Sequence, residues 1–109
     1  MAAQLRIVFK GMDPSPAVAA RIEERAGKLA HLFERATKCR VTVEAPHRRQ
    51  ATGKLFVVHV DITVPGEELA VSRSHRKDHA HEDVYVAIRD AFNAAGRRLQ
   101  DYARRKRGA

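Results

Sequence analysis

Residues 55–64 carry an apolar side chain at every second position, and this alternation constrains the fold more than any other feature of the sequence. A two-residue period is that of a β-strand, because successive side chains point to opposite faces of a sheet. The opposite face of this segment includes a histidine, an aspartate and a threonine. A strand with one apolar face needs a second layer of structure to cover it. The apolar positions are Phe56, Val58, Val60, Ile62 and Val64.

Three further segments show a similar alternation and are predicted to be strands. They are Gln4–Lys10, Lys38–Ala45 and Glu68–Ser74, of which the last has the least regular pattern. Pro65 and Gly66 between the last two strands predict a tight turn, with glycine where a positive φ is needed. Cys39 falls on the apolar face of its strand, so we expect a small core residue rather than a reactive thiol.

Two segments have instead the period of an amphipathic helix. The first begins at Pro16, which suits the first helical turn, and either Asp13 or Ser15 caps it. Its apolar stripe consists of Val18, Ile22, Ala26, Leu29 and Phe33. The second helix extends from about Glu82 to Lys106. Its apolar stripe consists of Tyr85, Ile88, Phe92, Ala95, Leu99 and Tyr102.

The element order is therefore β-α-β-β-β-α. One apolar face on each strand and one stripe on each helix predict an α+β two-layer sandwich, a four-stranded sheet with both helices on one face. The three strands after the first helix have short connections, so they should be antiparallel. The 109 residues fit one domain, with a core from about residue 4 to residue 106.

The sequence also bears on the compartment in which the protein acts. It holds no apolar run close to the ~20 residues that span a bilayer. A classical secretory signal is missing as well, so we expect no membrane association. The single cysteine excludes an internal disulfide and fits a reducing compartment, which predicts a cytoplasmic protein.

The net charge of +8 is concentrated in two segments. The ranges 35–54 and 97–107 each hold six basic residues and one acidic residue. Arginine outnumbers lysine 15 to 6, and its planar guanidinium suits bidentate contacts with phosphate. We therefore expect a polyanionic partner, with nucleic acid ahead of an anionic membrane surface. The alternative is a structural protein whose basic face only keeps it soluble.

Two groups of basic side chains are the candidate phosphate ligands. Arginines of the last helix lie opposite or beside its apolar stripe, and a second group lies in the loop before the long strand. Two separated basic anchors suit a folded RNA surface better than a single groove does. The candidates are Arg89, Arg97, Arg98, Arg104 and Arg105 on the helix and Arg48, Arg49 and Lys54 in the loop. A role for the exposed sheet face around Arg6, Arg40 and His59 is left open.

Histidines and carboxylates are concentrated in residues 74–83. The histidines there are His75, His79 and His81. Their spacing matches no zinc pattern, and neither a nucleophile nor a pocket accompanies them. We expect a polar loop that leads into a helix, with no metal, no cofactor, no small-molecule substrate and no enzymatic activity. A metal-dependent enzyme built on this loop is the alternative.

Several motifs, together with the element order, resemble the ribosome hibernation-promoting factor family, also called the ribosome-associated inhibitor A or sigma-54 modulation protein family. The motif that contributes most is Glu82–Phe92, EDVYVAIRDAF. The turn VPG at residues 64–66, the stretch VEAPHR at 43–48 and the stretch AHED at 80–83 add to it. The resemblance extends from about Leu5 to Arg105, which is almost the whole chain.

The resemblance implies a protein that binds the small ribosomal subunit, in the channel that messenger RNA and the tRNA anticodon ends would occupy. It would contact 16S ribosomal RNA through its basic surface and block translation under stress, with a fold similar to double-stranded RNA-binding domains. The family's basic helix positions correspond to Arg97, Arg98, Arg104 and Arg105, and its basic loop to Arg48, Arg49 and Lys54.

The sequence also departs from the family's pattern. Many members have an acid at the position of Arg89 and charged residues at the positions of Ala94 and Gly96. The chain ends at Ala109 without the dimerisation domain of the family's long form, which implies a short form that acts as a monomer or a weak homodimer. A general double-stranded RNA-binding module with a non-ribosomal target is the alternative function.

Overall fold

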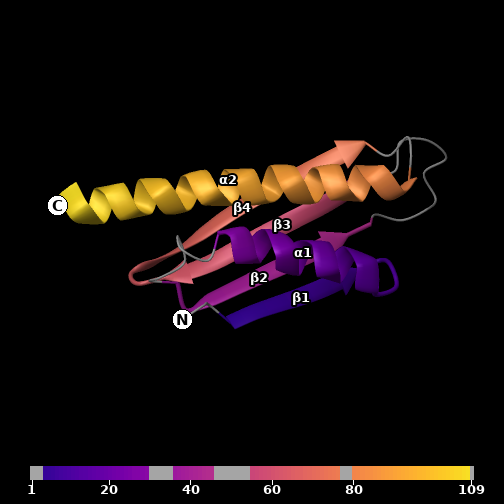
Figure 1. Ribbon diagram of the computed structural model, residues 1–109, viewed down its shortest axis with the longest axis horizontal. Coiled ribbons are helices and arrows are strands. Elements are labelled where there is room, and N and C mark those ends of the chain that lie inside the picture. Colours follow the sequence, from indigo (N-terminus) through magenta and orange to yellow (C-terminus); the bar gives the residue numbers. More distant parts are fainter. Residues whose placement is uncertain (1–3, 30–35, 46–54, 77–79, 109) are drawn as a thin grey trace.

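The computed structural model describes residues 4–29, 36–45, 55–76 and 80–108. Two helices lie on one face of a four-stranded sheet, which confirms the predicted α+β fold and its order β-α-β-β-β-α (Figure 1). The elements are β1 (Gln4–Lys10), α1 (Pro16–Lys28), β2 (Lys38–Glu44), β3 (Leu55–Val64), β4 (Glu67–Arg76) and α2 (Ala80–Gly108).

The strands follow one another across the sheet in chain order. β1 pairs with β2 in parallel, whereas β2 with β3 and β3 with β4 are antiparallel, as expected for the strands after α1. A parallel pair needs a crossover connection, and α1 lies on the path between β1 and β2. β1 and β4 are the edge strands. The face opposite the helices is called the open face below.

The apolar faces of the strands and helices meet in one core. The predicted inner face of β3 is confirmed, because its residues Val58, Val60, Ile62 and Val64 are buried. α2 contributes a wider apolar surface than its predicted stripe, since Val84, Ala87, Ala91 and Ala94 are buried as well. Tyr85 is only half-buried, and the guanidinium of Arg21 on α1 lies 4.8 Å from the centre of its ring. The wider surface allows α2 to pack on both β3 and β4.

The start of α1 distinguishes between its two candidate caps. The backbone N–H of Val18 donates a hydrogen bond to Oγ of Ser15 at 3.2 Å, so Ser15 rather than Asp13 is the capping residue. Such a bond satisfies one of the N–H groups that the first turn leaves without a partner. The helix ends at Lys28, and the predicted stripe residue Phe33 lies outside the described residues.

β4 and α2 both extend beyond their predicted limits. β4 continues past Ser74 to Arg76, because it stays in register with β3 as far as Leu55. The prediction of a loop at Arg76 was wrong, since backbone pairing in the hairpin and not side-chain alternation determines where this strand ends. Ala80, also assigned to that loop, is the first residue of α2, which ends at Gly108.

α2 is longer than the strands that it covers. Its 29 residues span about 43 Å at ~1.5 Å per residue, whereas the ten residues of β4 span about 33 Å. Tyr102 is buried and donates a hydrogen bond from its hydroxyl to the carbonyl of Pro65 at 2.9 Å, so the helix is attached to the β3–β4 turn. Beyond Tyr102 the helix continues past the turn as a projecting end (Figure 1).

Two glycines should respond in opposite ways to alanine. Gly11 has φ +71°, and a Cβ there would lie 2.3 Å from the carbonyl oxygen of Ala45. A Cβ on Gly96, within α2, would lie 3.4 Å from Cδ2 of Leu29, an ordinary contact. We expect Gly96→Ala to raise the free energy of unfolding by about 0.5–1 kcal/mol through lower chain entropy. Gly11→Ala should lower it by about 1–3 kcal/mol. Urea denaturation measures both, and a loss of stability in Gly96→Ala would contradict the helix packing described.

Cys39 should be unreactive in the folded protein. Burial, together with a smaller effect of the Asp61 carboxylate, raises the pKa of its thiol from 9.0 to about 11. Because the thiolate is the nucleophile, a thiol reagent at pH 8 should modify the native protein very slowly and the denatured protein fully. A folded-state pKa above the unfolded one favours folding below pH 9, and this contribution is lost as the pH rises towards 11. Rapid labelling of the native protein would contradict this prediction.

Candidate nucleic-acid interface

The arginines in the middle of α2 border a groove along one edge of the sheet. The groove has a volume of about 350 Å³ and lies between α2 and β4. Its lining on the helix is Ala94, Arg97, Arg98 and Asp101, and its lining on the strand is Ala70, Val71, Ser72 and Arg73. It is called the β4–α2 groove below. Three arginines, from two elements, therefore share one depression.

Helical and strand periodicity explain why these three arginines meet. Arg97 and Arg98 follow Ala94 by three and four residues, so they lie on the same side of α2. Arg73 is in register with the buried Val58 and so belongs to the helix-covered side of β4. Because β4 is an edge strand, the side chain of Arg73 is exposed at the margin of the sheet instead of being enclosed in the core.

Two of the groove arginines also satisfy backbone carbonyls of β4. Arg98 donates a hydrogen bond from Nη1 to the carbonyl of Ala70 at 3.0 Å, and Arg73 donates one to the carbonyl of Ser72 at 2.7 Å. An edge strand exposes such groups, which otherwise invite pairing with another chain. A guanidinium has five N–H donors, so each of these arginines keeps donors for a ligand.

The other predicted helix arginines are engaged in exposed ion pairs. Arg89 pairs with Asp90 at 3.2 Å, Arg104 pairs with Asp101, and Arg105 pairs with Glu67 at 3.1 Å. The Arg105 guanidinium also lies 5.8 Å from the ring centre of Tyr102. Exposed pairs of this kind contribute about 0–1 kcal/mol each, so a phosphate can displace the carboxylate at little cost.

Arg97 is different from these neighbours. Of the predicted phosphate ligands that the structure describes, it is the one with neither an ion pair nor a hydrogen bond. It lies in the β4–α2 groove, on a helix whose opposite side is buried. Its charge is thus available on a rigid support.

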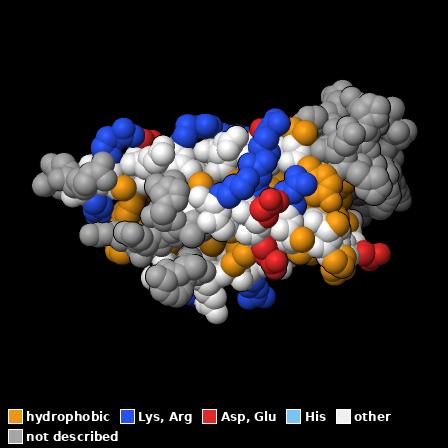
Figure 2. All heavy atoms as spheres, viewed as in Figure 1, with side chains coloured by type: hydrophobic (Ala, Val, Ile, Leu, Met, Phe, Trp, Pro, Cys, Tyr) orange, Lys and Arg blue, Asp and Glu red, His pale blue; other side chains and the backbone are white. Residues whose placement is uncertain are grey.

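Basic side chains on the helix-covered face lie mainly along the edge that α2 follows, with acidic atoms beside some of them (Figure 2). The predicted loop ligands Arg48, Arg49 and Lys54 lie outside the described residues, so their position relative to α2 stays a prediction. The histidine-rich segment also lies partly outside them. Within the described ranges, no three histidine, cysteine or acidic side chains are grouped closely enough to hold a metal ion.

Arg73 is the groove residue that the sequence analysis missed. It was placed in a strand, the least regular of the predicted strands, but no face was assigned to it. A usable signal was present, because Arg73 continues the two-residue period of Leu69 and Val71, both of which are buried. An arginine at an inward position is compatible with an edge strand only, where the side chain can reach solvent.

Neither helix of the described chain combines the length and the hydrophobicity needed to cross a bilayer. A model of the family described as Sigma 54 modulation protein / S30EA ribosomal protein matches residues 5–107. No individually curated protein matches the chain significantly.

Solved structures that share the fold include two proteins of low sequence identity. A ribosomal subunit interface protein from Coxiella burnetii superposes with a TM-score of 0.69 at 14% identity, covering 92% of this chain and 97% of that one. The Protein Y N-terminal domain from Thermus thermophilus gives a TM-score of 0.64 at 16% identity, covering 94% of this chain and 99% of that one. At such low identity the likeness establishes the architecture alone.

Neighbouring arginines in the groove should differ in their effect on stability. Arg98→Ala removes the donor to the Ala70 carbonyl, and water replaces it only in part, so the free energy of unfolding should fall by about 0.5–1 kcal/mol. Arg97→Ala removes no hydrogen bond and no ion pair and should change stability by less than about 0.5 kcal/mol. Thermal denaturation of both variants checks the difference. Equal effects would show that the Arg98 contact does not stabilise the fold.

Proposed function

Because this chain belongs to the Sigma 54 modulation protein / S30EA ribosomal protein family, we propose that it is a ribosome-binding regulator of translation. It binds the small ribosomal subunit in the cytoplasm, in the channel for messenger RNA and tRNA, and contacts 16S ribosomal RNA. The protein inhibits translation under stress by occupying that channel. This role is steric and needs neither a catalytic residue nor a cofactor.

The observation that carries the proposal is the β4–α2 groove, where Arg73, Arg97 and Arg98 converge and Arg97 has no partner. Guanidinium groups bind phosphate oxygens through paired N–H donors, and a ribosomal RNA backbone presents such oxygens in series. The similar Coxiella burnetii structure is that of a ribosomal subunit interface protein, which supports an RNA-facing groove in this chain.

The proposed RNA contacts extend along α2 on either side of the groove. They include Arg89, Arg104 and Arg105, whose exposed ion pairs would exchange a carboxylate for a phosphate. The loop residues Arg48, Arg49 and Lys54 complete the proposed set. Electrostatic contacts of this kind release counterions from the RNA, so affinity should decrease steeply with salt.

Sedimentation of the protein with purified small subunits across a salt series tests the proposal. Each neutralised phosphate contributes about 0.7 to the slope of log K against log salt, so six contacts give a slope near −4. Arg73→Ala with Arg97→Ala should weaken binding about tenfold or more and make the slope shallower by about 1.4. Absence of co-sedimentation at low salt would refute the proposed function.

A matched control separates local contacts from net charge. Lys10→Ala with Lys28→Ala removes the same formal charge from exposed positions outside the groove, and it should cost much less affinity. An excess of a short RNA duplex serves as competitor. If the duplex displaces the protein at a concentration comparable to that of the subunit, the protein is a general double-stranded RNA-binding module and the ribosomal proposal is wrong.

A further inference from the structure

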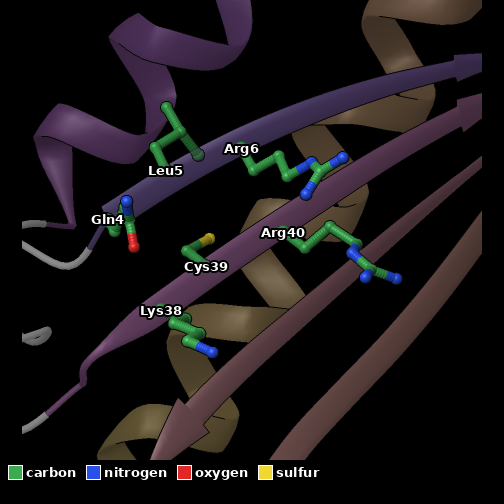
Figure 3. Close-up of a pocket in the computed structure, with 6 residues that line it drawn as sticks. All are labelled: Gln4, Leu5, Arg6, Lys38, Cys39 and Arg40. Carbon is green, nitrogen blue, oxygen red and sulfur yellow. The ribbon is translucent and has the colours of Figure 1, made fainter.

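The open face of the sheet carries a second basic group, which is separate from the β4–α2 groove. Arg6 on β1 is in register with Arg40 on β2, and Lys38 lies beside them on β2. They line a depression of about 350 Å³ (Figure 3). These three residues are called the β1–β2 corner below. The depression is also lined by Gln4, Leu5 and Cys39.

The charges of the β1–β2 corner are not neutralised by the protein. Among the described residues, Arg6, Lys38 and Arg40 form no ion pair and no hydrogen bond through their side chains. Asp61 on β3 is in register with Arg40, but the two form no ion pair. His59, the third residue noted on this face, is engaged elsewhere, since its ring nitrogens lie 2.7 Å from Ser72 Oγ and 3.3 Å from Glu44 Oε1.

The folding of the sheet does not account for both arginines. Like charges on directly opposed positions of paired strands are destabilising. Charged residues on an edge strand oppose aggregation, which is a sufficient reason for Arg6 on β1. Arg40 lies on the interior strand β2, where this reason does not apply. Both side chains extend across the sheet toward the next strand (Figure 3), and an anion bound by both would relieve their repulsion.

The charges around the β1–β2 corner favour a narrow polyanion over a broad anionic surface. On the same face, carboxylates border the corner: Glu44 at the end of β2, Asp61 on β3 and Glu68 on β4. Among the described side chains, the unpaired positive charges of the corner therefore lie at the start of β1 and β2. A broad anionic surface such as a membrane would bring its charges against these carboxylates. One phosphate backbone, in contrast, can follow the two strands, which are about 4.8 Å apart.

We propose that the β1–β2 corner binds the phosphate backbone of a second RNA segment, so that the protein is held between two RNA segments. The corner lies on the open face near the β1 edge, and the β4–α2 groove lies on the helix-covered side at the β4 edge. One segment therefore occupies each side of the sheet. The identity of the RNA rests on the proposed function, whereas the position of the second contact rests on the corner itself.

Hydroxyl-radical footprinting of the RNA in the small subunit tests this arrangement. Wild-type protein should protect two separate RNA segments. Arg6→Ala with Arg40→Ala should remove one set of protections and keep the other, whereas Arg73→Ala with Arg97→Ala should give the reverse. The variant with Arg6→Ala and Arg40→Ala should bind small subunits at least about tenfold more weakly than wild type. Its slope of log K against log salt should be shallower by about 1.4–1.8. Its thermal midpoint should be unchanged or higher, because a repulsion has been removed.

Two single substitutions on the same face refine the test. Asp61→Asn, beside Arg40, should strengthen binding, whereas Glu68→Gln makes the same charge change at the far strand and should have a smaller effect. Arg25→Ala with Lys28→Ala, both on α1 and outside the corner, controls for net charge. If this control weakens binding as much as Arg6→Ala with Arg40→Ala does, the effect is general electrostatics and the proposed corner site is overturned.

The experiments give different results if the second RNA contact at the corner is wrong and if the proposed function is wrong. If wild-type protein binds small subunits and the Arg6/Arg40 variant binds with the same affinity and footprint, the second RNA contact is refuted and the function stands. If wild-type protein does not bind subunits, the function fails. The corner is then tested by NMR titration with a short RNA duplex, and it is refuted if the Nε–H signals of Arg6 and Arg40 do not shift.

Discussion

The packing of α2 on β3 and β4 is the contact on which the other features depend. Phe92, Leu99 and Tyr102 are buried against the apolar face of the sheet, and small residues between them keep the helix close to the strands. Because one side of the helix is enclosed, its remaining residues have fixed directions. The arginines at positions 97 and 98 are thereby held beside β4.

The basic residues of α2 serve the fold and are available for binding at the same time. Arg98 satisfies a carbonyl of the edge strand, and Arg105 joins the projecting end of the helix to Glu67. These contacts are exposed and individually weak. They hold the side chains in position, and a ligand can still replace them. For the proposed RNA contacts, this ordering would reduce the entropy lost when a phosphate binds.

Local pattern was sufficient for most of the fold but not for the site. Alternation identified the core face of β3, and the helical period identified the centre of the buried side of α2, from Ile88 to Tyr102, but not its small flanking residues Ala91 and Ala94. Strand pairing is a non-local property. The end of β4 at Arg76 depends on its register with β3, and so does the place of Arg73 beside α2. The loop ligands Arg48, Arg49 and Lys54 stay predictions.

The end of α2 that projects beyond Tyr102 is subject to few packing constraints. Its side chains have little of the core beneath them, and Arg104 exposes 67% of its side-chain surface. Substitutions there should therefore be nearly neutral for folding. During evolution the basic character of this segment would drift unless selection for its interactions maintained it. The spacing of charge along this projecting segment is thus set by its interactions with other molecules and not by the fold.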